Sequence, residues 1–194
     1  MSFLFEDFKG WKALCEKENV PLYVPVLQYE IRQKGAVEED IWNGLSNAYQ
    51  VMKEAVQTGL TEDMTSHSGM IKNGAKKVAQ NKTIVLSKEF QTLISSALAA
   101  KEVNSCMGRV VAAPTAGASG ILPGVLTTMQ SIHQIDDKKI HEALLISAGI
   151  ALILEQKASL AGAVGGCQAE TGSAAAMASG SIVYCLGGSI DQVF

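Results

Sequence analysis

Apolar residues recur every three or four positions along much of the chain, which is the spacing of amphipathic α-helices. One regular stripe runs toward Gly59, and another follows Ser87, a residue suited to cap a helix N-terminus. The apolar positions are Ile41, Leu45, Ala48, Met52 and Ala55 in the first stripe, and Phe90, Leu93, Ile94, Ala97 and Leu98 in the second. We expect both stripes to face the core, and the first helix to end at Gly59.

Four further helices are predicted by the same spacing and by capping residues. The first helix is marked by the apolar residues Phe5, Phe8 and Cys15, and the second has Pro123 in its first turn and runs toward His133. The third is capped by Asp136 or Asp137, and its core positions are Ile140, Leu144, Ala148, Ala151 and Leu152. The fourth starts near Cys167, has Gln168 and Glu170 in its first turn, and stops at Gly187 and Gly188. Only residues 109–114 favour an extended backbone. The chain is therefore predicted to be all-α, a single compact helical domain over residues 1–194 with Gly-rich loops and buried helices of small residues.

Composition narrows the function classes. Apolar residues make up 47% of the 194 residues, and the net charge of −3 gives no general attraction to nucleic acid or to an acidic membrane. Two apolar segments, 143–154 and 171–190, are respectively too short and too weakly apolar to span a membrane. The four cysteines form no Cys-x-x-Cys pair and the acidic start does not match a signal peptide, so we expect a cytoplasmic protein with free thiols.

A glycine-rich segment, residues 104–124, is the first place where chemistry is expected. Arg109 is the only charged residue between positions 103 and 135, while Gly117 and Gly120 alternate with the hydroxyl residues Thr115 and Ser119. Consecutive N–H groups in such a loop, ahead of a helix, can bind a carboxylate or a phosphate. The segment matches no Walker or dinucleotide-binding motif, and the alternative interpretation is a glycine-rich turn between helices.

A cysteine at a predicted helix start is the second feature. Cys167 follows two glycines, and the free N–H groups of a helix start favour a thiolate, which can act as a nucleophile or a metal ligand. A cysteine nucleophile needs a histidine, but nothing in the sequence selects among the three at positions 67, 133 and 141. The alternative is a small buried thiol. Cys15 and Cys185 lie on apolar helix faces and are expected to serve packing, whereas Cys106 is ambiguous.

A cluster of hydroxyl groups around His67 is the third feature. Ser66 and Ser68 flank this histidine in segment 65–70, where they could bind a small polar substrate with His67 as acid or base. A solvated histidine in a helix-capping loop explains the same pattern equally well.

Three motifs together resemble the catalytic alpha chain of the iron–sulfur L-serine dehydratase family, in its two-subunit bacterial form. They read Asn104-Ser-Cys-Met-Gly, Ala113-Pro-Thr-Ala-Gly-Ala-Ser-Gly and Gly165-Gly-Cys-Gln-Ala-Glu-Thr-Gly-Ser-Ala-Ala-Ala-Met. The resemblance implies a [4Fe–4S] enzyme that converts L-serine to pyruvate and ammonia without pyridoxal phosphate. Its expected partner is a beta chain, and a homo-oligomer is a further candidate assembly. In that family, one iron lacks a protein thiolate and binds the substrate.

Residue roles follow from the same resemblance. It implies that Thr115, Gly117 and Ala118 bind the substrate carboxylate, with Asn104 and the pair Ser66 and Ser68 as further contacts. Cys167 matches a cluster ligand. The resemblance assigns no catalytic base, and His67 is our candidate for it.

The sequence departs from the family at the cluster. The family holds its cluster with three cysteines, two of them in a later segment containing Cys-Asp-Pro, whereas this sequence stops at Phe194. The positions of Cys15, Cys106 and Cys185 do not match those ligands. We therefore expect a C-terminally truncated chain that by itself binds no intact cluster and is inactive.

Other function classes stay open from the residues alone. A pyridoxal-phosphate lyase would use Lys157 or Lys101 for the Schiff base, and a hydrolase would use Cys167 as its nucleophile. A non-catalytic assembly subunit would use the sparsely charged second half of the chain, residues 103–194, to dock a partner.

Overall fold

A computed structural model describes residues 5–82 and 85–194, and over these ranges the chain is helical without any strand of a sheet. The first four residues, part of the start that argues against a signal peptide, lie outside this description. The helices are α1 Phe8–Glu18, α2 Val24–Lys34, α3 Glu38–Thr61, α4 Gly74–Gln80, α5 Lys88–Ser105, the 3₁₀ turn η1 Ala116–Ala118, α6 Ile121–His133, α7 Asp137–Lys157, α8 Gly162–Cys185 and α9 Ile190–Val193. The predicted all-α class is confirmed.

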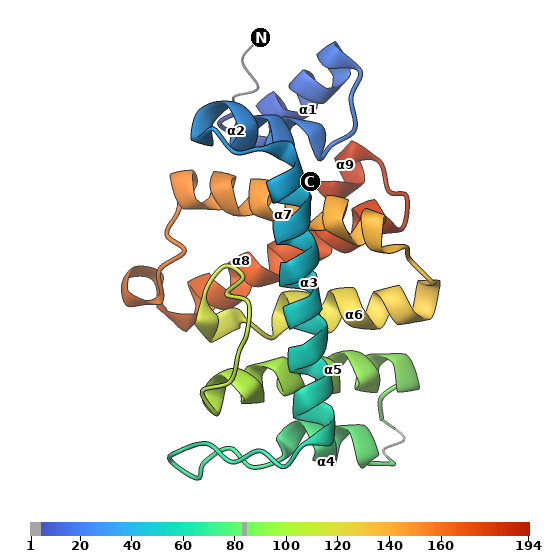
Figure 1. Cartoon of the computed structure of the whole chain (residues 1–194), viewed down its shortest axis with the longest axis vertical. Coiled ribbons are helices and arrows are strands. Elements are labelled where there is room, and N and C mark those ends of the chain that lie inside the picture. Colours follow the sequence, from blue (N-terminus) through green and yellow to red (C-terminus); the bar gives the residue numbers. More distant parts are fainter. Residues whose placement is uncertain (1–4, 83–84) are drawn as a thin grey trace.

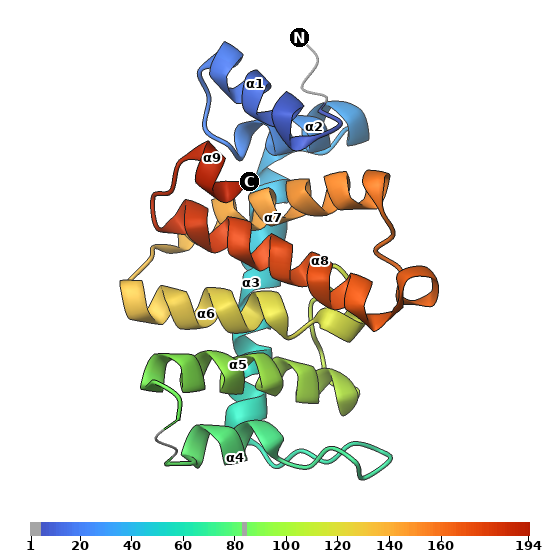
Figure 2. The same cartoon turned by 180° about the vertical axis from the view of Figure 1, so that it is seen from behind.

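A stack of helices crossed by one long helix forms the molecule. Helix α3 runs along the long axis and contacts α4, α5, α6 and α7, which lie one above another behind it (Figure 1). On the opposite face α8 packs against both α6 and α7 (Figure 2). Helices α1 and α2 cover one end of the stack. None of the helices in the described ranges combines the length and hydropathy that crossing a bilayer requires.

The core is centred on α7, which is buried along most of its length. Asp136 caps this helix by accepting a hydrogen bond from the Lys139 N–H at 2.9 Å, as predicted. Ile140 and Leu144 are buried, but Ala148 is exposed, so this part of the predicted core face is wrong. Because α2, α3 and α8 contact α7 from several sides, its buried surface is wider than one stripe. Ala148 instead lines a hollow together with Glu30 of α2 and Leu45 of α3.

Helix α5 buries a different face from the one that its apolar residues predict. Phe90 is 51% exposed and Leu98 is 37% exposed, whereas the small residues Ser96 and Ala99 are buried. Small side chains let α5 pack tightly between α3 and α6. A Cβ built at Gly59 of α3 would lie 2.6 Å from the Ala99 Cα, a separation that real atoms do not adopt.

Helix ends agree with the predictions in part. Ser87 caps α5 and Pro123 lies in the first turn of α6, as expected. Met52 and Ala55 of the first apolar stripe are buried, whereas the other three residues of that stripe are partly buried. Gly59 does not end its helix, which continues to Thr61. Gly59 serves the close approach to α5 instead. Helix α2 was not predicted, although Pro25 marks its first turn.

Candidate functional site

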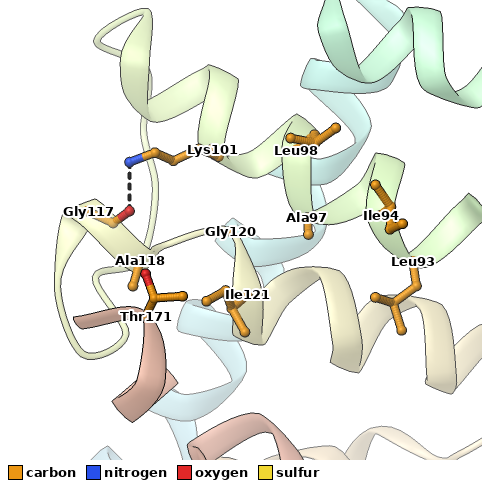
Figure 3. A pocket seen from close by; sticks show the side chains of 10 residues that line it. All are labelled: Leu93, Ile94, Ala97, Leu98, Lys101, Gly117, Ala118, Gly120, Ile121 and Thr171. Carbon is orange, nitrogen blue, oxygen red and sulfur yellow. Dashed lines mark hydrogen bonds between the residues drawn. The ribbon is translucent and has the colours of Figure 1, made fainter. Parts of the chain in front are cut away.

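The glycine-rich loop between α5 and α6 is held by side chains of α5 and by its own hydroxyl group. The Ala116 carbonyl accepts hydrogen bonds from Asn104 Nδ2 at 2.9 Å and from Ser119 Oγ at 2.8 Å. Lys101 Nζ donates to the Gly117 carbonyl at 2.6 Å (Figure 3). Asn104 and Lys101 stand one turn apart on α5, so a single helix face fixes two consecutive peptide groups.

This arrangement directs one N–H group away from α5. In a planar trans peptide the C=O and the following N–H point in opposite directions, so fixing the Ala116 carbonyl also fixes the Gly117 N–H. Within the described ranges, the N–H groups of Ala116 and Gly117 have no hydrogen-bond acceptor. The Ala118 N–H is already bonded to the Thr115 carbonyl at 3.2 Å. The loop therefore offers Ala116 and Gly117 as free donors, and Ala118 keeps its N–H within the turn.

The hydroxyl group of Thr115 is the most unusual polar atom in the loop. Its Oγ1 is buried and has no hydrogen-bond partner among the residues that the structure describes. Buried hydroxyl groups are normally paired, because leaving one unpaired costs about 1–3 kcal/mol. An unsatisfied hydroxyl beside free N–H donors is what a site for a small polar ligand provides.

The cysteine of the third motif lies beyond a kink in α8. Gly166 has φ 74° and ψ 176°, a backbone conformation open essentially to glycine alone, and it separates the first turn of α8 from the rest. The predicted helix start near Cys167 is confirmed, since regular helix begins after this kink. Cys167 is exposed.

A glutamate links the cysteine-bearing helix to the loop. Glu170, one turn beyond Cys167, is half-buried, and a Cβ built at Gly117 would lie 2.7 Å from its Oε2. A Cβ at Gly162 would lie equally close to that oxygen. The absence of side chains at both glycines therefore makes room for the Glu170 carboxylate. The second and third motifs, separated by about fifty residues in sequence, meet at this contact, where η1 lies beside the start of α8 (Figures 1 and 2).

An apolar cavity of about 320 Å³ adjoins the loop (Figure 3). Its walls are Leu93, Ile94 and Leu98 of the exposed α5 stripe, Ile121 of α6 and Thr171 of α8. Apolar residues of α5 that the sequence periodicity predicts in the core therefore line one wall of this cavity.

The remaining cysteines differ from Cys167 in their surroundings. Burial raises the pKa of both Cys15 and Cys185 to about 11, which keeps each thiol neutral near pH 7. Cys185 Sγ also lies 3.8 Å from the Lys139 carbonyl. Cys106 is half-buried at the end of α5. Across the described ranges, no three metal-binding side chains of the His, Cys, Asp and Glu types come together.

The hydroxyl cluster around His67 lies in a separate hairpin between α3 and α4. Ser66 and Ser68 contact one another through their hydroxyl oxygens at 3.2 Å, and Ser66 Oγ accepts from the Ile71 N–H. His67 is exposed, and the hairpin projects beside α4 (Figure 1). No hydrogen bond in the described part of the chain connects these three residues to the glycine-rich loop, so their roles as substrate contacts and base stay predictions.

The other candidate groups show no arrangement for the alternative chemistries. His141 is half-buried, and burial lowers its pKa. No hydrogen bond among the described residues pairs Cys167 with a histidine, as a cysteine hydrolase would require. Lys101 donates to the loop, and Lys157 is exposed at the end of α7.

Comparison with known proteins decides the family. A sequence model of the family described as "Serine dehydratase alpha chain" matches residues 17–194. The chain belongs to this family. The L-serine dehydratase alpha chain of Peptoniphilus asaccharolyticus is 35% identical over 182 residues, covering 92% of this chain and 62% of the relative. A probable L-serine dehydratase alpha chain of Bacillus subtilis (strain 168) is 30% identical over 192 residues, covering 97% of this chain and 64% of the relative.

A longer relative shows the same match. The L-serine dehydratase of Streptomyces coelicolor is 35% identical over 191 residues, which cover 95% of this chain but 42% of the relative. The chain thus spans less than two thirds of the length of each of these three members of the family.

The sequence alone did not indicate the contacts that three residues make at the site. Glu170 was noted only as an acid in a first turn, Lys101 as a possible Schiff-base lysine, and Ser119 as a loop hydroxyl. The spacing of Glu170 from Cys167, one helical turn, was the available signal for the first of them.

Proposed function

We propose that this chain forms the serine-binding part of an L-serine dehydratase, which converts L-serine to pyruvate and ammonia. The contact between the Glu170 carboxylate and Gly117 is the observation that carries this proposal, because it joins the cysteine-bearing helix to a loop with free donors. The names of the relatives supply the substrate.

The substrate carboxylate binds, in this proposal, to Thr115 Oγ1 and the Gly117 N–H. Both are donors without a partner in the described chain, and a carboxylate satisfies several donors at once. Asn104, Ser119 and Lys101 act on the loop rather than on the substrate, since their donors hold its carbonyl groups. Such positioning fixes the substrate α-carbon relative to the group that removes its proton.

A [4Fe–4S] cluster is part of the proposal, with Cys167 as one ligand. The described residues fit one ligand position and not a complete set, because Cys167 is exposed and no three metal-binding side chains come together among them. When bound, such a cluster would supply a Lewis acid for the serine hydroxyl. We propose that further ligands come from outside the described residues.

Anaerobic co-expression with a beta chain tests the proposed function. The expected result is that an assembled enzyme containing this sequence carries iron and sulfide and forms pyruvate from L-serine, measured on one sample. The 194 residues alone, after reconstitution with iron and sulfide, should hold no stable cluster and form no pyruvate. An assembled, iron-loaded enzyme that leaves L-serine unchanged would refute the proposal.

Replacing Thr115 with valine should weaken catalysis without weakening the fold. Valine keeps the shape but removes the hydroxyl, so kcat/KM for L-serine should fall by about 10- to 100-fold, on the order of 1–3 kcal/mol. The free energy of unfolding should change little, because the free protein loses no hydrogen bond.

Thr127→Val is the matched control. Its hydroxyl donates to the Pro123 carbonyl at 2.7 Å within α6, so its loss should lower stability slightly and leave kcat/KM unchanged. An unchanged kcat/KM in Thr115→Val would remove Thr115 from the site.

A further inference from the structure

The Glu170 carboxylate lies against the glycine-rich loop without a charged partner in the described chain. It is half-buried against the backbone of Gly117 and Gly162, yet within the described chain it has neither a hydrogen bond nor an ion pair. Lys101 of α5, which reaches the same loop, donates to the Gly117 carbonyl instead. A carboxylate that is partly removed from water without a partner is unfavourable, and a cationic ligand group would relieve that cost.

The glycine-rich loop beside Glu170 offers hydrogen-bond donors rather than negative charge. The Gly117 N–H and Thr115 Oγ1 are unpartnered donors suited to a carboxylate ligand. A ligand that carries only a carboxylate would therefore meet the negative charge of Glu170 at close range, where the repulsion is poorly screened. A ligand with an ammonium group one carbon away from its carboxylate satisfies both sides of the site.

We infer that Glu170 binds the α-ammonium group of the amino acid whose carboxylate is held by Thr115 and Gly117, and that it thereby restricts the site to zwitterions. This inference rests on the proposed function and deepens it. The site would thus discriminate in two ways, because Glu170 repels ligands that carry only a carboxylate and attracts the ammonium group of the substrate. Gly117 and Gly162 are required for this arrangement, because a side chain at either position would displace the Glu170 carboxylate.

The test compares two ligands that differ only at the α-substituent, L-serine and L-glycerate, in which a hydroxyl replaces the ammonium. Because the assembled enzyme converts L-serine, its binding is followed as KM and that of L-glycerate as a competitive inhibition constant, on the assembled enzyme and on its Glu170→Gln variant. We expect the variant to bind L-serine about 10- to 100-fold more weakly, as loss of a charged hydrogen bond implies. It should bind L-glycerate more tightly than the unmodified enzyme does, because the repulsion is gone.

Weaker binding of L-serine together with tighter binding of L-glycerate is a result that a merely structural role of Glu170 cannot produce. If Glu170→Gln weakens both ligands equally, or changes neither, the assignment of Glu170 is wrong while the proposed function stands. If the unmodified enzyme binds no L-serine, the proposed function fails first, and this inference fails with it.

Two further variants serve as controls. Glu155→Gln removes an exposed carboxylate at the end of α7 and should leave both constants unchanged. Should Glu170→Gln fail to fold, Glu170→Asp keeps the charge and should keep the preference for L-serine. The unmodified enzyme must also prefer L-serine over L-glycerate by at least about tenfold, and equal binding would overturn the inference.

Discussion

Replacing Cys167 with alanine should remove both the iron and the dehydratase activity from the assembled enzyme. In the proposed function this thiolate is a cluster ligand, and it is the exposed cysteine of the described chain, next to the helix kink at Gly166. Without one of its few protein ligands the cluster should be lost during purification. Iron, acid-labile sulfide and pyruvate formation, measured on the same anaerobic sample, check this expectation.

Cys185→Ala is the matched control for that experiment. The Cys185 thiol is half-buried near the Lys139 carbonyl, and burial raises its pKa to about 11, so it is a neutral packing group. This variant should keep its full iron content and its activity. Full iron content in Cys167→Ala would show that the ligand assignment is wrong.

The second large effect concerns stability, at the crossing of α3 and α5. Gly59→Ala places a Cβ against the backbone of Ala99, so the two helices must move apart. Forced separation of a well-packed interface costs typically 1–3 kcal/mol, a large part of the stability of a domain of this size. We expect a loss of about 2–3 kcal/mol in the free energy of unfolding, measured by urea titration with circular dichroism.

Gly44→Ala provides the opposite result in the same helix. Gly44 is exposed in α3, and a Cβ there meets nothing within 4 Å. Alanine should stabilise the helix by roughly 0.5–1 kcal/mol, because it restricts the unfolded chain and favours helical backbone. If Gly59→Ala were also stabilising, α5 would not be packed as closely as the structure shows.

Helix positions could be predicted from the sequence where a local signal, a regular apolar stripe or a capping residue, is enough to specify the element. The stripe of α3 and the Asp136 cap of α7 are of this kind. The buried face of α5 could not be predicted, because periodicity assumes that large apolar residues lie inside. In α5 the close approach of two neighbours selects alanine and serine for the buried face, and Leu98 is left at a cavity wall.

The site was predictable as far as its residues lie in short motifs. The glycine-rich loop and Cys167 are visible in the sequence as such motifs. The contact between Glu170 and Gly117 depends on how α8 packs beside η1, which no local pattern encodes. The hydrogen bond from Asn104 to the Ala116 carbonyl depends on the same packing, while the role of Asn104 as a substrate contact stays a prediction.

Helix α5 both packs the centre of the helix stack and holds the glycine-rich loop. Its middle is wedged between Gly59 on one side and Gly124 on the other, while its last turns carry the donors of Lys101 and Asn104. A shift of α5 away from either glycine would also move the side chains that hold the Ala116 and Gly117 carbonyl groups. If the loop binds serine as proposed, substitutions that loosen this packing are expected to lower heat tolerance and ligand affinity together.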